Sequence, residues 1–361
     1  MLKYNFHLID GLYFELLDTL QDKEYHVKFI EEKDGDSLTM YETDIKKGMW
    51  TKIPRRYLGD YWVEIWDRGF LKKKISFLEH IKGQKVFISF ESKSIGDTIA
   101  WMPYCQEFKE TYGCEVVVST FMNDWFQKIY PELKFVPRGF VVNNIIAMIE
   151  IGWFYENHKE PVNPATIPLQ KAATNILNLE FKEILSKIYF IPKERPIEEK
   201  YVCIATHSTS GLKYWTNEGW QEVINHLVNE GYKVIEISKD DTNFQNCLKL
   251  DDKSIPNTMN YIHYSEYVIG LSSGLSWLSW ALGKKVVMIS NFTEKDHEFT
   301  INCVRIYDEE ICHGCWNKPI FKFDKGNWWY CPEHEDTPRQ FECHKLISAS
   351  KVIDEIKKAG I

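Results

Sequence analysis

Short stretches of alternating apolar and polar residues fill the first 80 positions. The stretches 25–45 and 61–80 both follow this period of two, and a turn sequence at 34–36 interrupts the first of them. Alternation of this kind is typical of antiparallel strands with one buried face. The pattern predicts a small antiparallel β domain over residues 1–80, a barrel or a sandwich, without a catalytic cluster.

Further along, continuous apolar runs take turns with amphipathic stretches. Runs at 85–90 and 114–120 predict buried strands, and the stretch 98–112 predicts a helix. The run 144–154 fits either a third strand or a buried helix, because periodicity does not separate the two. Strands in alternation with helices are typical of a parallel α/β sheet, so we predict a first α/β domain over 81–195.

A polar segment with two prolines at 191–200 predicts a linker, after which the alternation restarts. Strands predicted at 201–206 and 232–238 flank a helix predicted at 217–231. A second α/β domain is therefore expected over 196–308. Ligands of such folds bind beyond the carboxyl ends of the strands, so a ligand cleft is expected between the two α/β domains.

Charge and composition exclude several classes of protein. The 361 residues carry a net charge of −8, which argues against non-specific nucleic-acid binding. The first residues lack the basic start and apolar core of a signal peptide, and no apolar run is long enough to span a membrane. We therefore expect a cytoplasmic protein with no membrane span and no nucleic-acid partner.

Four of the nine cysteines are crowded into one short region. They are Cys312, Cys315, Cys331 and Cys343, with two, fifteen and eleven residues between successive members. In a reducing compartment such crowding favours a metal ion over disulfides, and four thiolates can surround one tetrahedral ion. Zinc is the default and iron is also compatible. The spacing predicts a metal finger over 309–345, followed by a C-terminal helix over 346–361.

Two alternatives stay open for this cluster. The thiols could carry no metal, or one of the neighbouring histidines His313, His334 and His344 could replace a cysteine as ligand. A closed site with four protein ligands leaves no open position, so the metal is expected to be structural. The remaining cysteines are scattered among apolar neighbours and are expected to be buried thiols: Cys105, Cys114, Cys203, Cys247 and Cys303.

Asp97 directly follows a glycine, shortly after the strand predicted at 85–90. It could be the N-cap of the next helix, because an Asp side chain accepts hydrogen bonds from the first backbone N–H groups. It could instead face a ligand at the carboxyl end of the strand. There a carboxylate can take the proton of a hydroxyl group that attacks a sugar.

The loop 207–215, after a predicted strand, is rich in hydroxyl groups and contains a lysine. Lys213 offers a positive charge, and Thr206, Ser208 and Thr209 offer hydroxyl donors, which together suit a phosphate group. The alternative is a solvated surface loop with a surface lysine.

A second candidate phosphate loop lies in the stretch 270–281, where a strand end, a glycine and a helix start follow one another. A helix start binds phosphate through its free N–H groups and its dipole. The residues that would face the anion are Ser273, Gly274, Leu275 and Ser276. The stretch matches neither the P-loop nor the dinucleotide fingerprint, and ordinary helix capping would also explain its composition.

Three stretches in this order resemble the heptosyltransferase pattern of GT-B glycosyltransferases: "SIGD" at 94–97, "HSTSGLKYW" at 207–215 and "GLSSGLSW" at 270–277. The stretches "CHGCW", "WYCPEH" and "RQFECHKLI" extend the resemblance to the bacterial autotransporter heptosyltransferases, over about the whole chain. The resemblance implies an α/β fold of GT-B type, in which twin Rossmann-like domains follow the β domain.

The resemblance also implies a reaction. Enzymes of this family transfer heptose from ADP-heptose to serine hydroxyls of autotransporter passenger domains, in the cytoplasm and without a cofactor for the chemistry. They form large homo-oligomers, and their cysteine finger holds iron, which makes iron the preferred ion over zinc. By position, Asp97 matches the catalytic aspartate, Lys213 matches the lysine that contacts phosphate, and 273–276 match the phosphate loop.

We therefore predict an inverting protein O-glycosyltransferase in which Asp97 is the general base. A lipopolysaccharide-core heptosyltransferase is the first alternative, and the cysteine quartet and the leading β domain argue against it. A non-catalytic scaffold that binds a nucleotide sugar is the second. One departure from the family pattern is Ser272, which stands where relatives are expected to have a proline, and this change could loosen the phosphate loop.

Overall fold

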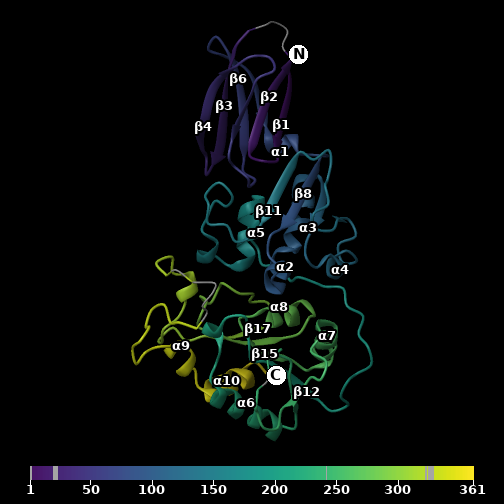
Figure 1. Ribbon diagram of the computed structural model, residues 1–361, viewed down its shortest axis with the longest axis vertical. Coiled ribbons are helices and arrows are strands. Elements are labelled where there is room, and N and C mark those ends of the chain that lie inside the picture. Colours follow the sequence, from purple (N-terminus) through teal and green to yellow (C-terminus); the bar gives the residue numbers. More distant parts are fainter. Residues whose placement is uncertain (1, 19–22, 241, 322, 324–328) are drawn as a thin grey trace. The chain divides into compact units, whose positions relative to one another are not determined.

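The computed structural model describes residues 2–18, 23–240, 242–321, 323 and 329–361. The chain divides into two compact units (Figure 1). The first unit comprises Met1–Lys93, Trp101–Pro164 and Lys171–Lys182, and the second comprises Ser94–Ala100, Ala165–Gln170 and Glu183–Ile361. Within the predicted metal finger, residues 322 and 324–328 lie outside the described part of the chain.

The first unit contains a four-stranded antiparallel sheet in the order β4-β3-β6-β7. Its strands are β3 (Tyr25–Lys33), β4 (Asp36–Ile45), β6 (Tyr61–Asp67) and β7 (Phe70–Ser76). In the first five residues of β3 and of β6 every second side chain is buried, which matches the period of two in the sequence. The predicted N-terminal antiparallel sheet is thus confirmed.

A second sheet of the first unit mixes parallel and antiparallel strands, in the order β10-β9-β8-β11-β1-β2-β5. Its strands are β1 (Lys3–Leu8), β2 (Leu12–Asp18), β5 (Trp50–Ile53), β8 (Lys85–Phe90), β9 (Glu115–Ser119), β10 (Lys134–Phe135) and β11 (Ala147–Ile151). β1 pairs in parallel with β11 at Leu8 and Ala147. Strands from both sides of the boundary predicted at residue 80 therefore share one sheet, and the ambiguous run at 144–154 contains a strand.

The helices of the first 180 residues are short. They are α1 (Phe77–His80), α2 (Ile95–Trp101), α3 (Pro103–Tyr112), α4 (Asn123–Phe126) and α5 (Leu169–Leu177). The helix predicted over 98–112 is in fact two helices, because Pro103 begins a new helix after Met102. The start of α2, Ser94–Ala100, belongs to the second unit.

The second unit is built on a six-stranded parallel sheet in the order β14-β13-β12-β15-β16-β17. Its strands are β12 (Tyr201–Ala205), β13 (Lys233–Glu236), β14 (Leu248–Lys249), β15 (Val268–Leu271), β16 (Val286–Ile289) and β17 (Cys303–Ile306). This is the order 3-2-1-4-5-6 of a doubly wound fold, in which the strand order reverses beside β12. The loops after β12 and β15 therefore flank the switch point, where such folds bind ligands.

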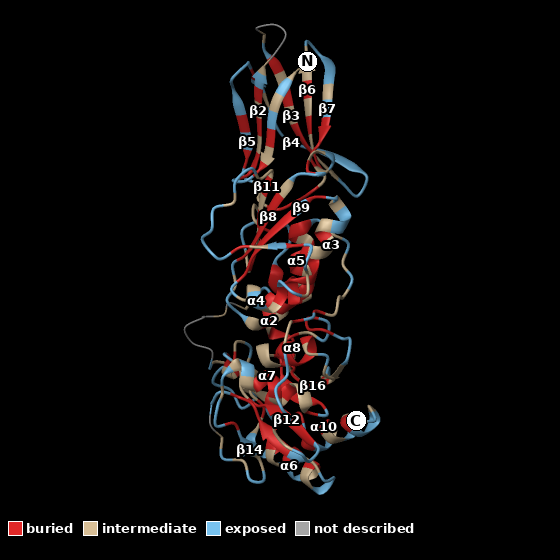
Figure 2. Cartoon of the chain, turned by 90° about the vertical axis from the view of Figure 1, so that its right-hand side faces the viewer, coloured by how far each residue is buried: buried red, intermediate tan, exposed pale blue. Residues whose placement is uncertain are grey.

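Helices cover the parallel sheet. α6 (Asn217–Asn229) and α10 (Ala349–Lys358) pack against each other and against strands, and α8 (Gly274–Ala281) packs against β15 and β16. The remaining helices of the second unit are α7 (Ile255–Tyr264) and α9 (Glu342–Lys345). The strands β12, β15 and β16 are buried throughout, as the red strands of Figure 2 show, because helices shield both faces of such a sheet.

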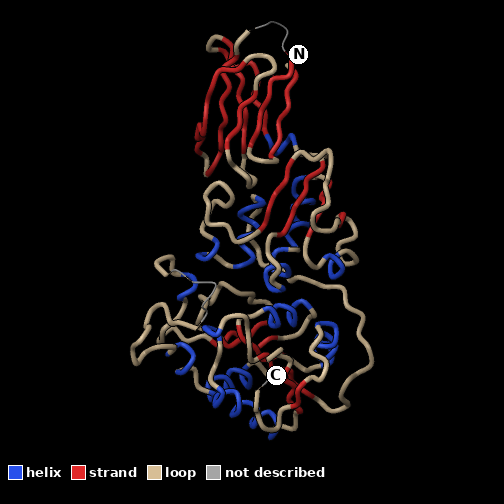
Figure 3. The backbone as a smooth tube through the Cα atoms, viewed as in Figure 1, coloured by secondary structure: helices blue, strands red, loops and turns tan. Residues whose placement is uncertain are grey.

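Residues 179–200 form neither helix nor strand between α5 and β12, as the tan tube of Figure 3 shows. This stretch includes the segment 191–200, which the sequence predicts to be a linker. All the predicted domain boundaries, at residues 80, 195, 308 and 345, stay predictions.

Candidate functional site

The candidate phosphate loop lies where the sequence predicts it, between the end of β15 and the start of α8. Ser273 precedes α8 with an extended backbone, at φ −148° and ψ 166°. Its hydroxyl oxygen is buried and has no hydrogen-bond partner among the described residues. The first N–H groups of a helix also have no partner within the helix. The start of α8 therefore presents unpaired donors, as an anion-binding helix start does.

The other residues of this loop contribute through the backbone. The Ser276 hydroxyl donates a hydrogen bond of 2.6 Å to the carbonyl of Leu271, so it closes the turn and is not a free donor. Gly274 leaves room for the start of α2, because a Cβ atom at Gly274 would lie 3.3 Å from the Cβ of Ile95. The predicted residues 273–276 are thus one continuous turn whose free polar groups are a hydroxyl and backbone N–H groups.

The starts of α2 and α8 are in direct contact within the second unit. A Cβ atom added to Gly96 would lie 3.7 Å from the Cα of Gly274 and 3.2 Å from Cδ1 of Trp277. Glycine at both positions permits this close approach of two backbones. The contact brings the residue that follows Gly96, which is Asp97, next to the phosphate loop.

Asp97 is the third residue of α2 and is only 9% exposed. Its own N–H donates to the Ser94 hydroxyl at 3.4 Å, and the Ser94 carbonyl accepts from the Thr98 N–H at 3.2 Å. Ser94 is therefore the N-cap of α2, and the alternative interpretation of Asp97 as the N-cap is wrong. The cap does not require the Asp97 carboxylate.

Lys213 ends a short 3-10 helix, Gly211–Lys213, in the loop after β12. The side chain is half-buried, with Nζ 5.5 Å from the centre of the Phe292 ring, and it forms no ion pair in the described part of the chain. Burial lowers the pKa of Lys213, while the carboxylates of Glu298 and Asp97 act in the opposite direction. The ammonium group of Lys213, which has no ion pair in the described part of the chain, therefore lies within electrostatic range of the Asp97 carboxylate.

The hydroxyls predicted around Lys213 are not equivalent. The Thr206 hydroxyl donates to the buried Glu236 carboxylate at 2.5 Å, and the Ser208 hydroxyl donates to the Ser210 carbonyl at 2.8 Å. Both therefore fix the loop. Thr209 is exposed and has no hydrogen-bond partner among the residues described, so its hydroxyl is available to a ligand.

Three charged or titratable residues near Lys213 were missed by the sequence analysis: His297, Glu298 and Arg305. The charge of Glu298 interacts with those of His297, Arg305 and Lys213. These residues follow β16 or lie on β17, far from Lys213 in the sequence, and no motif marks them. Only the fold brings them together.

The four cysteines of the predicted finger lie close together. Cys315, Cys331 and Cys343 are buried, at 7%, 5% and 8% exposed. Burial raises the pKa of Cys343, and the charges of the other three thiols raise it further. Burial also raises the pKa of Cys312 and that of Cys315, each to about 12. Crowded, buried thiols are costly to ionise alone and are suited to a cation, which favours their deprotonated form.

The ligand set itself is less regular than four thiols. The Sγ of Cys312 forms one compact group with ligand atoms of His334 and Glu342, all within 4.8 Å of one another. Nε2 of His344 is buried without a hydrogen-bond partner in the described structure, and burial lowers the pKa of His344 to about 4. The donor chemistry fits a metal ion, while coordination by the four cysteines alone stays a prediction.

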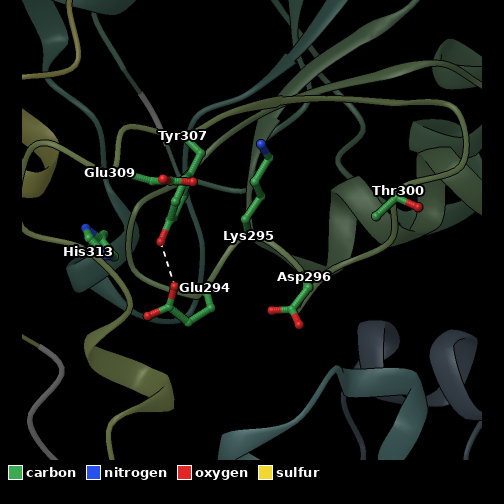
Figure 4. A pocket seen from close by; sticks show the side chains of 7 residues that line it. All are labelled: Glu294, Lys295, Asp296, Thr300, Tyr307, Glu309 and His313. Carbon is green, nitrogen blue, oxygen red and sulfur yellow. Dashed lines mark hydrogen bonds between the residues drawn. The ribbon is translucent and has the colours of Figure 1, made fainter.

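A separate pocket of about 620 Å³ opens in the second unit (Figure 4). It is lined by Glu294, Lys295, Asp296, Thr300, Tyr307, Glu309 and His313. The Tyr307 hydroxyl donates to Glu294 at 2.7 Å across it. None of the predicted catalytic or donor-binding residues lines this pocket, and its three carboxylates would repel a diphosphate.

Comparisons with known proteins show the family to which the chain belongs. The model of glycosyltransferase family 9 (heptosyltransferase) matches residues 168–322, which contain Lys213 and the phosphate loop. The chain is 31% identical to the autotransporter heptosyltransferase Aah of Escherichia coli over 355 residues, 92% of this chain and 88% of Aah. The chain belongs to the autotransporter heptosyltransferase family. It is therefore a glycosyltransferase, as the sequence predicts.

TibC is a second relative in this family. The autotransporter heptosyltransferase TibC of Escherichia coli O78:H11 is 30% identical over 363 residues, 94% of this chain and 86% of TibC. A crystal structure of TibC matches with a TM-score of 0.82 and 28% identity, over 98% of this chain and 94% of that chain. The TibC in that structure is dodecameric, contains iron and is in complex with ADP-D-β-D-heptose. The match confirms the α/β fold with its N-terminal antiparallel sheet.

Among the helices that the structure describes, none combines the length and the apolar composition needed to cross a lipid bilayer.

The contact between α2 and α8 makes a prediction for Gly96→Ala. The added methyl group would press on Trp277 and push the two helix starts apart. Alanine is a better helix former than glycine by about 1 kcal/mol, so the melting temperature should not fall. We expect glycosyl transfer to fall roughly 10-fold, the effect of a small misplacement of reacting groups, in a steady-state assay. A variant with the wild-type rate would show that this contact does not set the site geometry.

Proposed function

We propose that this protein transfers heptose from ADP-heptose to serine or threonine hydroxyls of an autotransporter passenger domain, with inversion at the anomeric carbon. The observation that carries the proposal is the contact of Gly96 with Gly274, which brings Asp97 beside a helix start with unpaired donors. The names of Aah and TibC, and the ADP-D-β-D-heptose bound to TibC, support the choice of donor and acceptor.

The donor diphosphate would bind at the start of α8. The Ser273 hydroxyl and the N–H groups of Gly274 and Leu275 would donate to its oxygens, and the helix dipole favours negative charge there. Lys213 has no ion pair in the described structure, so its ammonium group can pair with the ligand. Thr209 adds an exposed hydroxyl. These donors would stabilise the ADP that leaves as the sugar–oxygen bond breaks.

Asp97 would act as the general base. Its carboxylate takes the proton of the acceptor hydroxyl, the oxygen of that hydroxyl attacks the anomeric carbon, and ADP leaves from the opposite face. The Ser94 hydroxyl caps α2, so Asp97 does not serve as the cap of this helix. Asp97 lies in the first turn of α2, and its charge interacts with that of Lys213.

The cysteine cluster would hold one structural metal ion. We assign iron, with zinc as the alternative, to Cys312, Cys315, Cys331 and Cys343, and no cofactor to the chemistry. The mutual proximity of the thiols and the iron reported in TibC support this assignment. When bound, the ion would cross-link the chain segments that carry the four thiols. The proposal includes a large homo-oligomer, like the dodecamer of TibC, in the cytoplasm.

Asp97→Asn tests the base. The amide cannot accept the proton, so we expect transfer to fall at least about 100-fold, the usual size of a general-base contribution. ADP affinity should stay near wild type, since the phosphate donors are unchanged. Intact mass of a passenger domain after incubation with ADP-heptose measures transfer, and calorimetry measures ADP binding. Transfer at the wild-type rate would refute the base assignment.

The same mass assay separates the proposed function from its alternatives. Wild-type protein should add heptose-sized increments to the passenger domain. Transfer only to a lipopolysaccharide-core sugar acceptor would favour the core-type enzyme. No increment with any nucleotide sugar, together with ADP binding, would favour a non-catalytic scaffold.

Lys213→Ala tests the phosphate site. Loss of a charge-assisted contact of about 1.5–3 kcal/mol should weaken ADP binding roughly 10- to 100-fold. Lys295→Ala is the matched control, because Lys295 is exposed and lines the separate pocket of Figure 4. Equal ADP affinities of both variants and the wild type, measured by calorimetry, would remove Lys213 from the site.

Cys331→Ser tests the metal site. Elemental analysis of the purified wild-type protein should find about one iron per chain, and the variant should lose it together with thermal stability. Cys247→Ser is the control, since Cys247 lies outside the cluster and its thiol donates to the carbonyl of Leu248. Zinc in place of iron would correct the ion, and the absence of any metal would overturn the site.

A further inference from the structure

Glu298 is a buried carboxylate that holds the residues on both sides of the phosphate loop. Its Oε1 accepts a hydrogen bond from the hydroxyl of Ser272, the residue before the loop. Its Oε2 accepts a hydrogen bond of 2.8 Å from Nε1 of Trp277, the residue after the loop. The side chain is 7% exposed, so water does not compete with these bonds.

Trp277 connects this carboxylate to α2. Cδ1 of its indole ring lies 3.2 Å from the position of a Cβ on Gly96, the residue before Asp97. The other contacts of the ring hold it in place, with ring centres 4.8 Å from Phe299 and 5.3 Å from Trp280. A hydrogen bond to Glu298 therefore fixes the surface against which the start of α2 rests.

Positive groups surround Glu298 from several elements. They are Lys213 from the loop after β12 and Arg305 from β17. The neighbouring His297 also interacts with the carboxylate, although burial lowers the pKa of His297. Arg305 donates to the carbonyl and hydroxyl oxygens of Thr293, at 3.2 and 2.8 Å, and forms no ion pair within the described residues. Burial opposes the ionisation of Glu298, but these charges outweigh it and hold the pKa of Glu298 below its usual value. Glu298 is thus an anion in a positive environment.

We propose that Glu298 is a positioning residue for the transfer reaction, which clamps Ser272 and Trp277 and so fixes the phosphate loop relative to Asp97. The inference rests on the proposed function. A carboxylate suits this role because all its partners are donors. Oε1 accepts from the Ser272 hydroxyl and, at 3.5 Å, from the Thr293 hydroxyl, while Oε2 accepts from the Trp277 indole. A glutamine has one acceptor oxygen, and its NH₂ group would face a donor. The Ser272 hydroxyl donates one of these hydrogen bonds.

Glu298 also sets the charge of the site before the donor binds. Burial lowers the pKa of Lys213, and of the groups that face it Glu298 opposes this shift most, ahead of Asp97, while Arg305 adds to it. ADP binding needs the protonated lysine, so it should weaken as pH rises through the pKa of Lys213. Removal of the Glu298 charge lowers that pKa, and the alkaline loss of ADP binding should move to lower pH.

The test compares Glu298→Gln with Trp277→Phe. In both, we expect kcat to fall roughly 10-fold or more, because the loop loses an anchor. Only Glu298→Gln should move the loss of ADP affinity at alkaline pH to lower pH, since Trp277→Phe keeps the negative charge of Glu298. At neutral pH, ADP should bind Glu298→Gln at least as tightly as wild type, because a nearby negative charge is gone. A residue that merely stabilised the fold would not produce this split.

Glu309→Gln is the control, because Glu309 is exposed and lies outside the proposed machinery, and it should match wild type in kcat and in the pH profile. Wild-type kcat together with an unchanged pH dependence of ADP affinity in Glu298→Gln would overturn the proposal. If that variant does not fold, wild-type kcat in Trp277→Phe overturns it. Wild-type protein that transfers no sugar would refute the proposed function instead, so the two failures are distinguishable.

Discussion

The contact between Gly96 and Gly274 is the constraint on which the proposed site depends. It allows two helices, one entered from a strand of the first unit and one from β15, to begin side by side within the second unit. A helix start concentrates unpaired N–H groups and partial positive charge. With the two starts in contact, one can hold an anion while the other orients a carboxylate, and a larger residue at either glycine would separate them.

Charge balance at the site supports the proposed nucleotide-sugar ligand. Lys213 and Arg305 carry positive charges without ion pairs in the described structure, and the Ser273 hydroxyl is a buried donor without an acceptor. The negative charge of Glu298 offsets part of this positive charge. Its carboxylate also accepts hydrogen bonds from Ser272 and Trp277, on either side of the phosphate loop. A diphosphate would complete the balance. The acidic pocket of Figure 4 has the opposite character.

The local sequence pattern predicted many of the strands and the phosphate loop. The period of two predicted the antiparallel strands β3 and β6, and the apolar runs predicted the parallel strands β8, β9, β12 and β13. The phosphate loop was also predictable, because a strand end, a glycine and a helix start lie next to one another in the sequence. Spacing also predicted a metal site at the four cysteines, and that site stays a prediction.

Features that depend on distant residues were not predictable in this way. The pairing of β1 with β11 joins segments about 140 residues apart, so no local pattern indicates it. Ser94 replaces Asp97 as the cap because the helix begins two residues earlier than the aspartate, and such boundaries are the least predictable part of an element. Glu298 and Arg305 resemble ordinary surface charges in the sequence, and only the parallel sheet brings them beneath the loop.

A crystal structure of the protein with ADP-heptose bound would test the central claim most directly. The account predicts that the diphosphate contacts Ser273, the N–H groups of Gly274 and Leu275, and Nζ of Lys213. It also predicts that the Asp97 carboxylate lies on the side of the anomeric carbon opposite to the leaving diphosphate. A diphosphate bound elsewhere, or an Asp97 side chain turned away from the sugar, would contradict the account.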